Sequence, residues 1–173
     1  MDGTGKMLTT FAAQFSTYRP VRVISYPTDQ ALGYEDLIAL VVSMAPKDSF
    51  VIVGESFSGP IAIEVAATLR NVVGLVLASS FARHPAPSFL TPMARIVDLA
   101  WIPNSMIVAG LLGSAATPEL ADRLGRVLAG LPREVIRRRT IEVLQSTSEI
   151  GFARFIAPSC VYMDDSIAWS TKE

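Results

Sequence analysis

Residues 50–63 constrain the fold more than any other stretch of the sequence, because an apolar run ends in a turn of small residues that leads at once into a helix-like segment. A strand that reverses directly into a helix crowds its own backbone, so the turn between the two needs small side chains. Gly54, Ser58 and Gly59 supply them around Ser56. The stretch therefore predicts a strand, a sharp turn with Ser56 at its tip, and a helix.

Ser56 is the candidate reactive residue of this turn. A strained turn of this kind holds the serine hydroxyl clear of a sheet and directs the N–H groups of the following helix at a reacting atom. The spacing departs from the pattern G-x-S-x-G, since Ser58 occupies the last position and the glycine follows at Gly59. The alternative interpretation is an ordinary turn in which Ser56 caps the helix.

The segments around the turn predict an α/β fold. β-branched residues favour a strand at 20–26, apolar spacing favours helices at 34–44 and 59–70, and a nearly continuous apolar run predicts a strand at 72–78 that is covered on both faces. With the strand before Ser56, the order is strand, helix, strand, helix, strand. Short connections in this order indicate a parallel sheet with right-handed crossovers. The active site of such a sheet lies at the carboxyl ends of its strands.

A run of helix-like segments after residue 79 predicts a helical cap at 80–147, inserted after the strand that follows the turn. Thr117 is a suitable N-cap in front of Pro118. The run Arg137-Arg138-Arg139 is interpreted as a solvated helix face rather than a binding patch. The cap helices are expected at 92–100, 105–112, 118–129 and 133–144, and outside the cap a helix is expected at 6–15 and a last strand at 156–163.

Length and composition exclude several classes of protein. The 173 residues fit one domain, 1–173, and a net charge of −1 gives no reason to expect a nucleic-acid partner. The longest apolar stretch, 96–112, is interrupted by polar residues and proline, so no membrane span is expected, and without a signal peptide the expected location is cytoplasmic. The single cysteine, Cys160, and the single histidine, His84, are far apart, so no disulfide, metal site or cofactor is expected.

On these features the sequence resembles the α/β-hydrolase superfamily, and within it small bacterial serine esterases and thioesterases. The resemblance covers residues 1–163 in order: a glycine-containing loop, helix, strand, helix, nucleophile turn, helix, strand, helical cap and strand. The turn at Ser56 is its most specific part. The resemblance implies a three-layer core with a parallel sheet, of which this chain holds a part, and a cap inserted after the strand that follows the turn.

The resemblance also implies roles for individual residues. Ser56 matches the nucleophile, and the backbone N–H of Phe57 matches one donor of the oxyanion hole. Met1 falls where the second donor is expected, although as a chain start it would carry a charged amine. The family order Ser, Asp, His places the acid after the cap, and Asp165, with Asp164 beside it, follows the last expected strand near that point.

The only histidine, His84, precedes the predicted cap, whereas the family's histidine follows it. A serine hydroxyl needs an adjacent base to take its proton, so His84 is a candidate base only in a rearranged site. Its place in the sequence favours a loop or pocket-rim role, and no histidine is expected within hydrogen-bond reach of Ser56. The chain is therefore interpreted as a piece that lacks the first strands and the last strand–histidine segment. Exposed sheet edges would then allow it to form oligomers.

Two functions of different classes follow. The first is hydrolysis of a carboxylic ester or thioester by Ser56, with a small apolar acyl compound as substrate. The second is a catalytically incomplete remnant that binds a small apolar ligand or a partner. A nucleotide-binding Rossmann domain is disfavoured, because the glycines after the strand do not form G-x-G-x-x-G. The apolar acyl chain is favoured by uncharged residues of the predicted cap, namely Phe89, Leu90, Trp101, Ile102, Met106, Leu111 and Leu112.

Overall fold

The computed structural model describes residues 2–81, 105, 108, 112, 117–145 and 160–163. The chain divides into two compact units. The first comprises residues 32–95 and 139–173, and the second comprises 2–31 and 96–138. The predicted division into one domain with a cap at 80–147 stays a prediction. Each unit is described by itself below.

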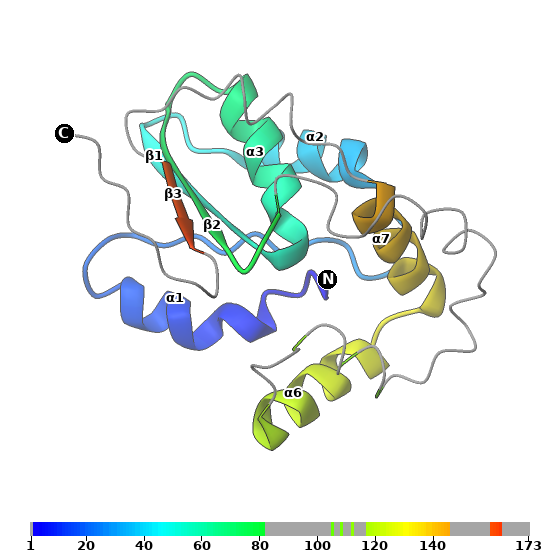
Figure 1. The fold of residues 1–173 in the computed structure, drawn as a ribbon. Helices are drawn as coiled ribbons and strands as arrows, with labels where there is room; N and C mark the ends of the chain where they lie inside the picture. Colours follow the sequence, from blue (N-terminus) through cyan, green and yellow to red (C-terminus); the bar gives the residue numbers. More distant parts are fainter. Residues whose placement is uncertain are drawn as a thin grey trace. The chain divides into compact units, whose positions relative to one another are not determined.

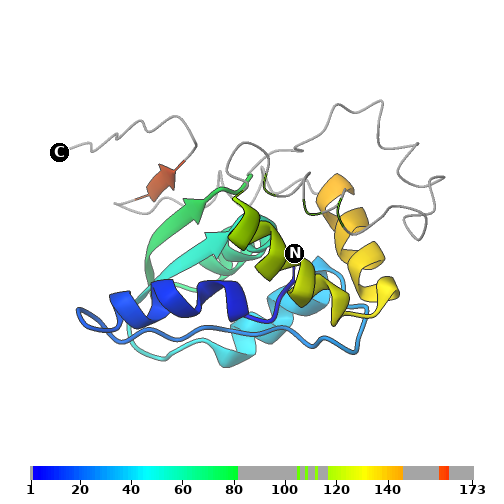
Figure 2. The ribbon, with the colours of Figure 1, turned by 90° about the horizontal axis from the view of Figure 1, so that it is seen from below.

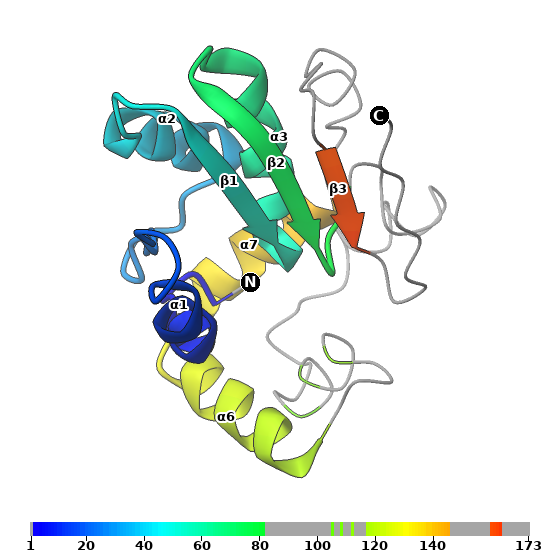
Figure 3. The same ribbon diagram turned by 90° about the vertical axis from the view of Figure 1, so that its left-hand side faces the viewer.

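The first unit contains a parallel sheet of three strands, which run side by side in the same direction (Figure 3). The strands are β1 (Phe50–Glu55), β2 (Val72–Ala78) and β3 (Cys160–Met163), and β2 lies between the other two. The predicted parallel strands before Ser56 and at 72–78 are therefore confirmed. Of the strand predicted at 156–163, the described part is β3. The register places Glu55 opposite Ala78, so β1 and β2 end at the same edge.

Two helices of the first unit are seen in Figure 1. Helix α2 (Tyr34–Met44) precedes β1 in the chain, and α3 (Gly59–Thr68) follows it. Helix α2 has the predicted bounds, and the Asp36 carboxylate in its first turn accepts a hydrogen bond from the Gly33 N–H at 3.2 Å. Helix α3 connects β1 to β2 and packs on one face of the sheet through a cluster of apolar side chains. The fold class is thus α/β. The buried members of the cluster are Ala62, Ile63, Ala66, Val72, Leu75 and Leu77.

Strand β1 lies at an edge of the described sheet, and one of its faces is exposed. Val51 and Val53 alternate with residues that face α3, and they remain 55% and 47% exposed. Val73 of β2 is 47% exposed, next to an irregularity in the pairing of the two strands. The other residues of β2 are buried or half-buried on both faces, as the sequence predicted for 72–78.

The strand predicted at 20–26 is wrong, because the structure shows no strand there. Isolated hydrogen bonds join this segment to the N-terminal loop: the Tyr26 N–H donates to the Gly3 carbonyl at 2.7 Å, and the Ser25 hydroxyl donates to the Thr4 carbonyl at 3.0 Å. β-branched residues favour a strand only where a neighbouring strand completes a ladder. Here the segment bonds to a loop instead.

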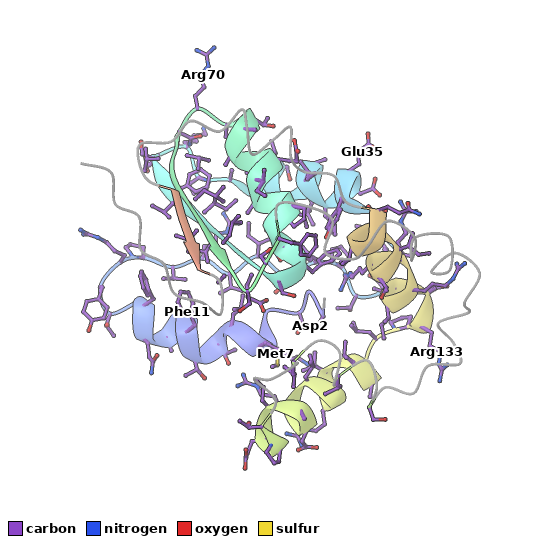
Figure 4. The ribbon with its side chains drawn as sticks, in the orientation of Figure 1. Asp2, Met7, Phe11, Glu35, Arg70 and Arg133 are labelled. Carbon is purple, nitrogen blue, oxygen red and sulfur yellow. The ribbon has the colours of Figure 1, made fainter. Side chains whose placement is uncertain are left out.

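The second unit has its own apolar cluster, built around α6 (Pro118–Ala129). The 3₁₀ helix η1 (Lys6–Leu8) lies beside α6 (Figure 2), and Met7 packs against the cluster (Figure 4). Helix α1 (Thr9–Phe15) continues η1, so the helix predicted at 6–15 is confirmed. The cluster comprises Val108, Leu124, Leu128, Leu131 and Ile136, with Leu112, Ala121 and Met7 packed against it.

The cap helices predicted near the end of the chain agree with the structure where it describes them. Helix α6 has the predicted bounds, and the Thr117 side chain accepts a hydrogen bond from the Leu120 N–H at 3.3 Å as its N-cap. Helix α7 (Arg133–Gln145) ends one residue beyond the prediction. The helix predicted at 92–100 lies outside the described residues, as does most of the one at 105–112.

Candidate active site

Ser56 lies between the end of β1 and the start of α3, as the sequence predicted. It is the first residue of a short 3₁₀ helix, η2 (Ser56–Ser58), which runs directly into α3. Its φ angle is 49°, in the left-handed region that a serine seldom adopts. Such a backbone costs about 1–3 kcal/mol and persists only where the surroundings enforce it. Since Glu55 and Ser58 are the N-caps of η2 and α3, the interpretation of Ser56 as an N-cap is wrong.

Two glycines make room for this turn. A Cβ atom on Gly54 would lie 2.7 Å from the Cβ of Ala62 and 2.9 Å from the carbonyl oxygen of Ser58. A Cβ atom on Gly59 would lie 1.7 Å from the Ser80 hydroxyl oxygen. Both positions therefore need glycine, because a side chain would collide with neighbours that hold the turn. The second required glycine stands three residues after Ser56 rather than two.

The end of β2 contributes a second strained residue beside the turn. Ser56 and Ser79 are the non-glycine residues of positive φ in the described part of the chain, and Ser79 has a φ of 44°. The next residue, Ser80, donates a hydrogen bond from its hydroxyl to the carbonyl oxygen of Ser56 at 2.6 Å. The strain in the described backbone thus gathers at the carboxyl ends of two adjacent parallel strands, where active sites of such sheets lie.

Phe57 anchors the turn in the interior of the first unit. Its side chain is 1% exposed, and its ring stacks on the ring of Tyr34 with centroids 4.8 Å apart. The Tyr34 hydroxyl donates a hydrogen bond to the Phe57 carbonyl oxygen at 3.1 Å. The Tyr34 N–H in turn donates to a carboxylate oxygen of Glu142 at 3.2 Å. These contacts join α2, the turn and α7 around the residue next to Ser56.

Arg139 also belongs to this cluster. The sequence analysis placed Arg137, Arg138 and Arg139 on a solvated helix face, and for Arg139 that interpretation is wrong. Arg137 and Arg138 are exposed, but Arg139 is 0% exposed. Its guanidinium carbon lies 6.0 Å from the centroid of the Phe57 ring, within the range of a cation–π contact. One arginine of the run is therefore part of the core around the turn.

Four other predicted site residues cannot be placed. Met1, His84, Asp164 and Asp165 all lie outside the described residues. Their roles as second oxyanion donor, base and acid stay predictions. So does the prediction that no histidine lies within hydrogen-bond reach of Ser56, since the described part of the chain contains no histidine.

Sequence reasoning missed Ser80, Tyr34 and Arg139 as neighbours of the turn. Tyr34 carried a weak signal, because it is the first residue of a helix whose apolar face was predicted. Ser80 and Arg139 carried none: a serine after a strand and an arginine among arginines are ordinary surface residues. Both residues are distant from the turn in the sequence, so their contacts with it depend on the tertiary fold.

Comparison with known proteins finds no protein-family model, no curated protein and no solved structure that matches the chain. Within the part of the chain that the structure describes, none of the helices combines the length and the hydropathy needed to cross a lipid bilayer.

Proposed function

We propose that the chain is a serine hydrolase of the α/β-hydrolase type, which cleaves carboxylic ester or thioester bonds with Ser56 as the nucleophile. The observation that carries this proposal is the strained backbone of Ser56, with a φ of 49° between a parallel strand and a helix. A serine held in this way at the carboxyl edge of a parallel sheet is the arrangement of the nucleophile turn in such enzymes.

In the proposed reaction, the Ser56 hydroxyl oxygen attacks the acyl carbon and a carbon–oxygen bond forms. The hydroxyl proton passes to a base, and it leaves with the alcohol or thiol when the bond to the leaving group breaks. Water then attacks the acyl-enzyme, releases the acid and restores the hydroxyl. The Phe57 N–H, at the start of the helical segment, donates to the oxyanion that forms in each step.

The proposed substrate has an apolar acyl chain. The support is a set of uncharged aliphatic and aromatic residues within 89–112, namely Phe89, Leu90, Trp101, Ile102, Met106, Leu111 and Leu112. Leu112, the described member of that set, packs against the apolar cluster of the second unit, so it also has a structural role. The other members lie outside the described residues.

The proposal is tested with a fluorophosphonate probe, which transfers its phosphonyl group to an activated serine oxygen with loss of fluoride. The protein is incubated with the probe, and the modified residue is located by mass spectrometry of its peptides. We expect one phosphonyl group on Ser56 and none in Ser56→Ala. Ser58→Ala is the matched control, because it removes a hydroxyl from the same turn and should still be labelled.

A second arm identifies the base. If no histidine reaches Ser56, His84→Ala should be labelled at a rate within about twofold of the wild type. A loss of about a hundredfold, the usual size of a general-base contribution, would assign His84 as the base of a rearranged site. Absence of labelling in the wild type would reject the proposal and favour the remnant that binds a small apolar ligand.

A further inference from the structure

The peptide group between Ser56 and Phe57 has a partner on its carbonyl side. The carbonyl oxygen of Ser56 accepts the Ser80 hydroxyl at 2.6 Å and also the N–H of Gly59. The described chain has no cis peptide bond, and in a trans peptide the C=O and the N–H point in opposite directions. Holding the Ser56 carbonyl therefore fixes the direction in which the Phe57 N–H points.

The Ser80 hydroxyl occupies a position that its surroundings prepare for it. Gly59 leaves open the space in which the hydroxyl oxygen sits, since a Cβ there would lie 1.7 Å from it. The strained Ser79, with a φ of 44°, turns the chain at the end of β2 and brings Ser80 to the turn. The unusual place of the glycine, one residue after the expected position, thus has a physical reason.

We propose that Ser80 is a positioning residue for the reaction at Ser56. Its hydroxyl holds the plane of the Ser56–Phe57 peptide, and by donating to the carbonyl it polarises the same peptide group and makes the Phe57 N–H a stronger donor. Hydrogen bonds in such chains strengthen one another. Ser80 acts through this peptide and does not touch the substrate. This role rests on the proposed function of Ser56 and Phe57.

The test is the rate of fluorophosphonate labelling, resolved into the maximal rate constant and the probe concentration at half-maximal rate. Ser80→Ala should lower the maximal rate constant about 5- to 30-fold, as expected for the loss of one hydrogen bond worth about 1–2 kcal/mol in the transition state. The half-maximal concentration should stay within about twofold, because Ser80 does not contact the probe.

Three further variants separate positioning from simple loss of stability. Ser43→Ala is the matched control, because the Ser43 hydroxyl also donates to a backbone carbonyl, that of Leu40 at 2.7 Å, but on helix α2. It removes a hydroxyl-to-carbonyl hydrogen bond away from the turn and should leave the labelling rate unchanged. Ser80→Thr keeps the hydroxyl and should restore the rate. Ser80→Cys carries a weaker donor and should be labelled slowly. If Ser80→Ala does not fold, the comparison of Ser80→Cys with Ser80→Thr takes its place.

The outcomes distinguish the two proposals. If the wild type is labelled at Ser56 and Ser80→Ala is labelled just as fast, the role of Ser80 is rejected and the nucleophile stands. A slow Ser80→Ala whose rate Ser80→Thr does not restore would mean that residue 80 only supports the local structure, and this also rejects the role. If wild-type Ser56 is not labelled at all, the proposed function fails, and the role of Ser80 fails with it.

Discussion

The Tyr34 hydroxyl donates a hydrogen bond to the Phe57 carbonyl oxygen at 3.1 Å, and the two rings stack with centroids 4.8 Å apart. Tyr34 is the first residue of α2, and Phe57 follows the candidate nucleophile Ser56. The pair therefore ties the start of one helix to the turn that precedes another. Both side chains are buried, so the hydrogen bond lies away from water.

Tyr34→Phe removes this hydrogen bond and keeps the stacked ring. We expect a loss of about 1–2 kcal/mol in the free energy of unfolding, because the Phe57 carbonyl stays buried with one partner fewer. The measurement is chemical denaturation. Tyr18→Phe is the control, since Tyr18 is 80% exposed and its change should stay within about 0.5 kcal/mol. Equal stability of the two variants would show that the bond contributes nothing.

Gly54→Ala should damage the turn. The new Cβ would lie 2.7 Å from the Ala62 Cβ and 2.9 Å from the Gly59 Cα, so β1 and α3 would have to separate. Overpacking of this kind costs about 1–3 kcal/mol.

Gly125→Ala is the matched control for Gly54→Ala. Gly125 lies within α6, and a Cβ there meets nothing within 4 Å. The same substitution should therefore raise stability by about 0.5–1 kcal/mol through helix propensity. Thermal unfolding of the two variants should shift the midpoint in opposite directions, and a shift of the same sign would contradict the packing at the turn.

Several elements could be predicted from the sequence because their signals are local. Helices α2 and α6 and strand β2 have the predicted bounds. Apolar spacing indicated all three, and Thr117 with Pro118 marked the start of α6. The place of Ser56 followed from small residues around it. In each case the deciding residues are neighbours in the sequence, so no knowledge of the tertiary fold was needed.

The remaining features depend on residues that are distant in the sequence. The segment 20–26 has the composition of a strand, but the loop beside it offers no ladder. Ser80 meets Ser56 because two strands end at one edge, and Arg139 reaches Phe57 from another helix. The candidate acid Asp165, and His84 as a base in a rearranged site, stay predictions, since both residues lie outside the described part of the chain.

Arg139→Ala should destabilise the first unit, whereas Arg137→Ala should not. Arg139 is 0% exposed and its guanidinium lies against the Phe57 ring, so truncation removes packing as well as charge. We expect a loss of about 2–5 kcal/mol, by analogy with large buried apolar side chains cut to alanine. Arg137 is exposed on the same helix, and its loss should stay within about 0.5 kcal/mol. If Arg139→Ala and Arg137→Ala melt at the same temperature, the Arg139 side chain is not buried in solution.

The exposed valines of β1 give the last prediction. Val51 and Val53 are 55% and 47% exposed, and exposed apolar strands bind hydrophobic dyes and promote association. The double substitution Val51→Thr and Val53→Thr keeps β-branched shapes suited to a strand while making the face polar. We expect weaker dye fluorescence and less association by light scattering, with an unchanged melting temperature.

Val65→Thr is the control, because it makes the same valine-to-threonine change at a buried position. Val65 lies in α3 and is 0% exposed. There the hydroxyl enters the core, so this variant should lose about 1–3 kcal/mol and bind more dye, not less. If the double variant in β1 melts earlier in the same way, Val51 and Val53 are packed in solution, and a covering segment must be sought on that face of the sheet. If instead its stability holds and dye binding falls, Val51 and Val53 are exposed in solution and bind the dye in the wild type.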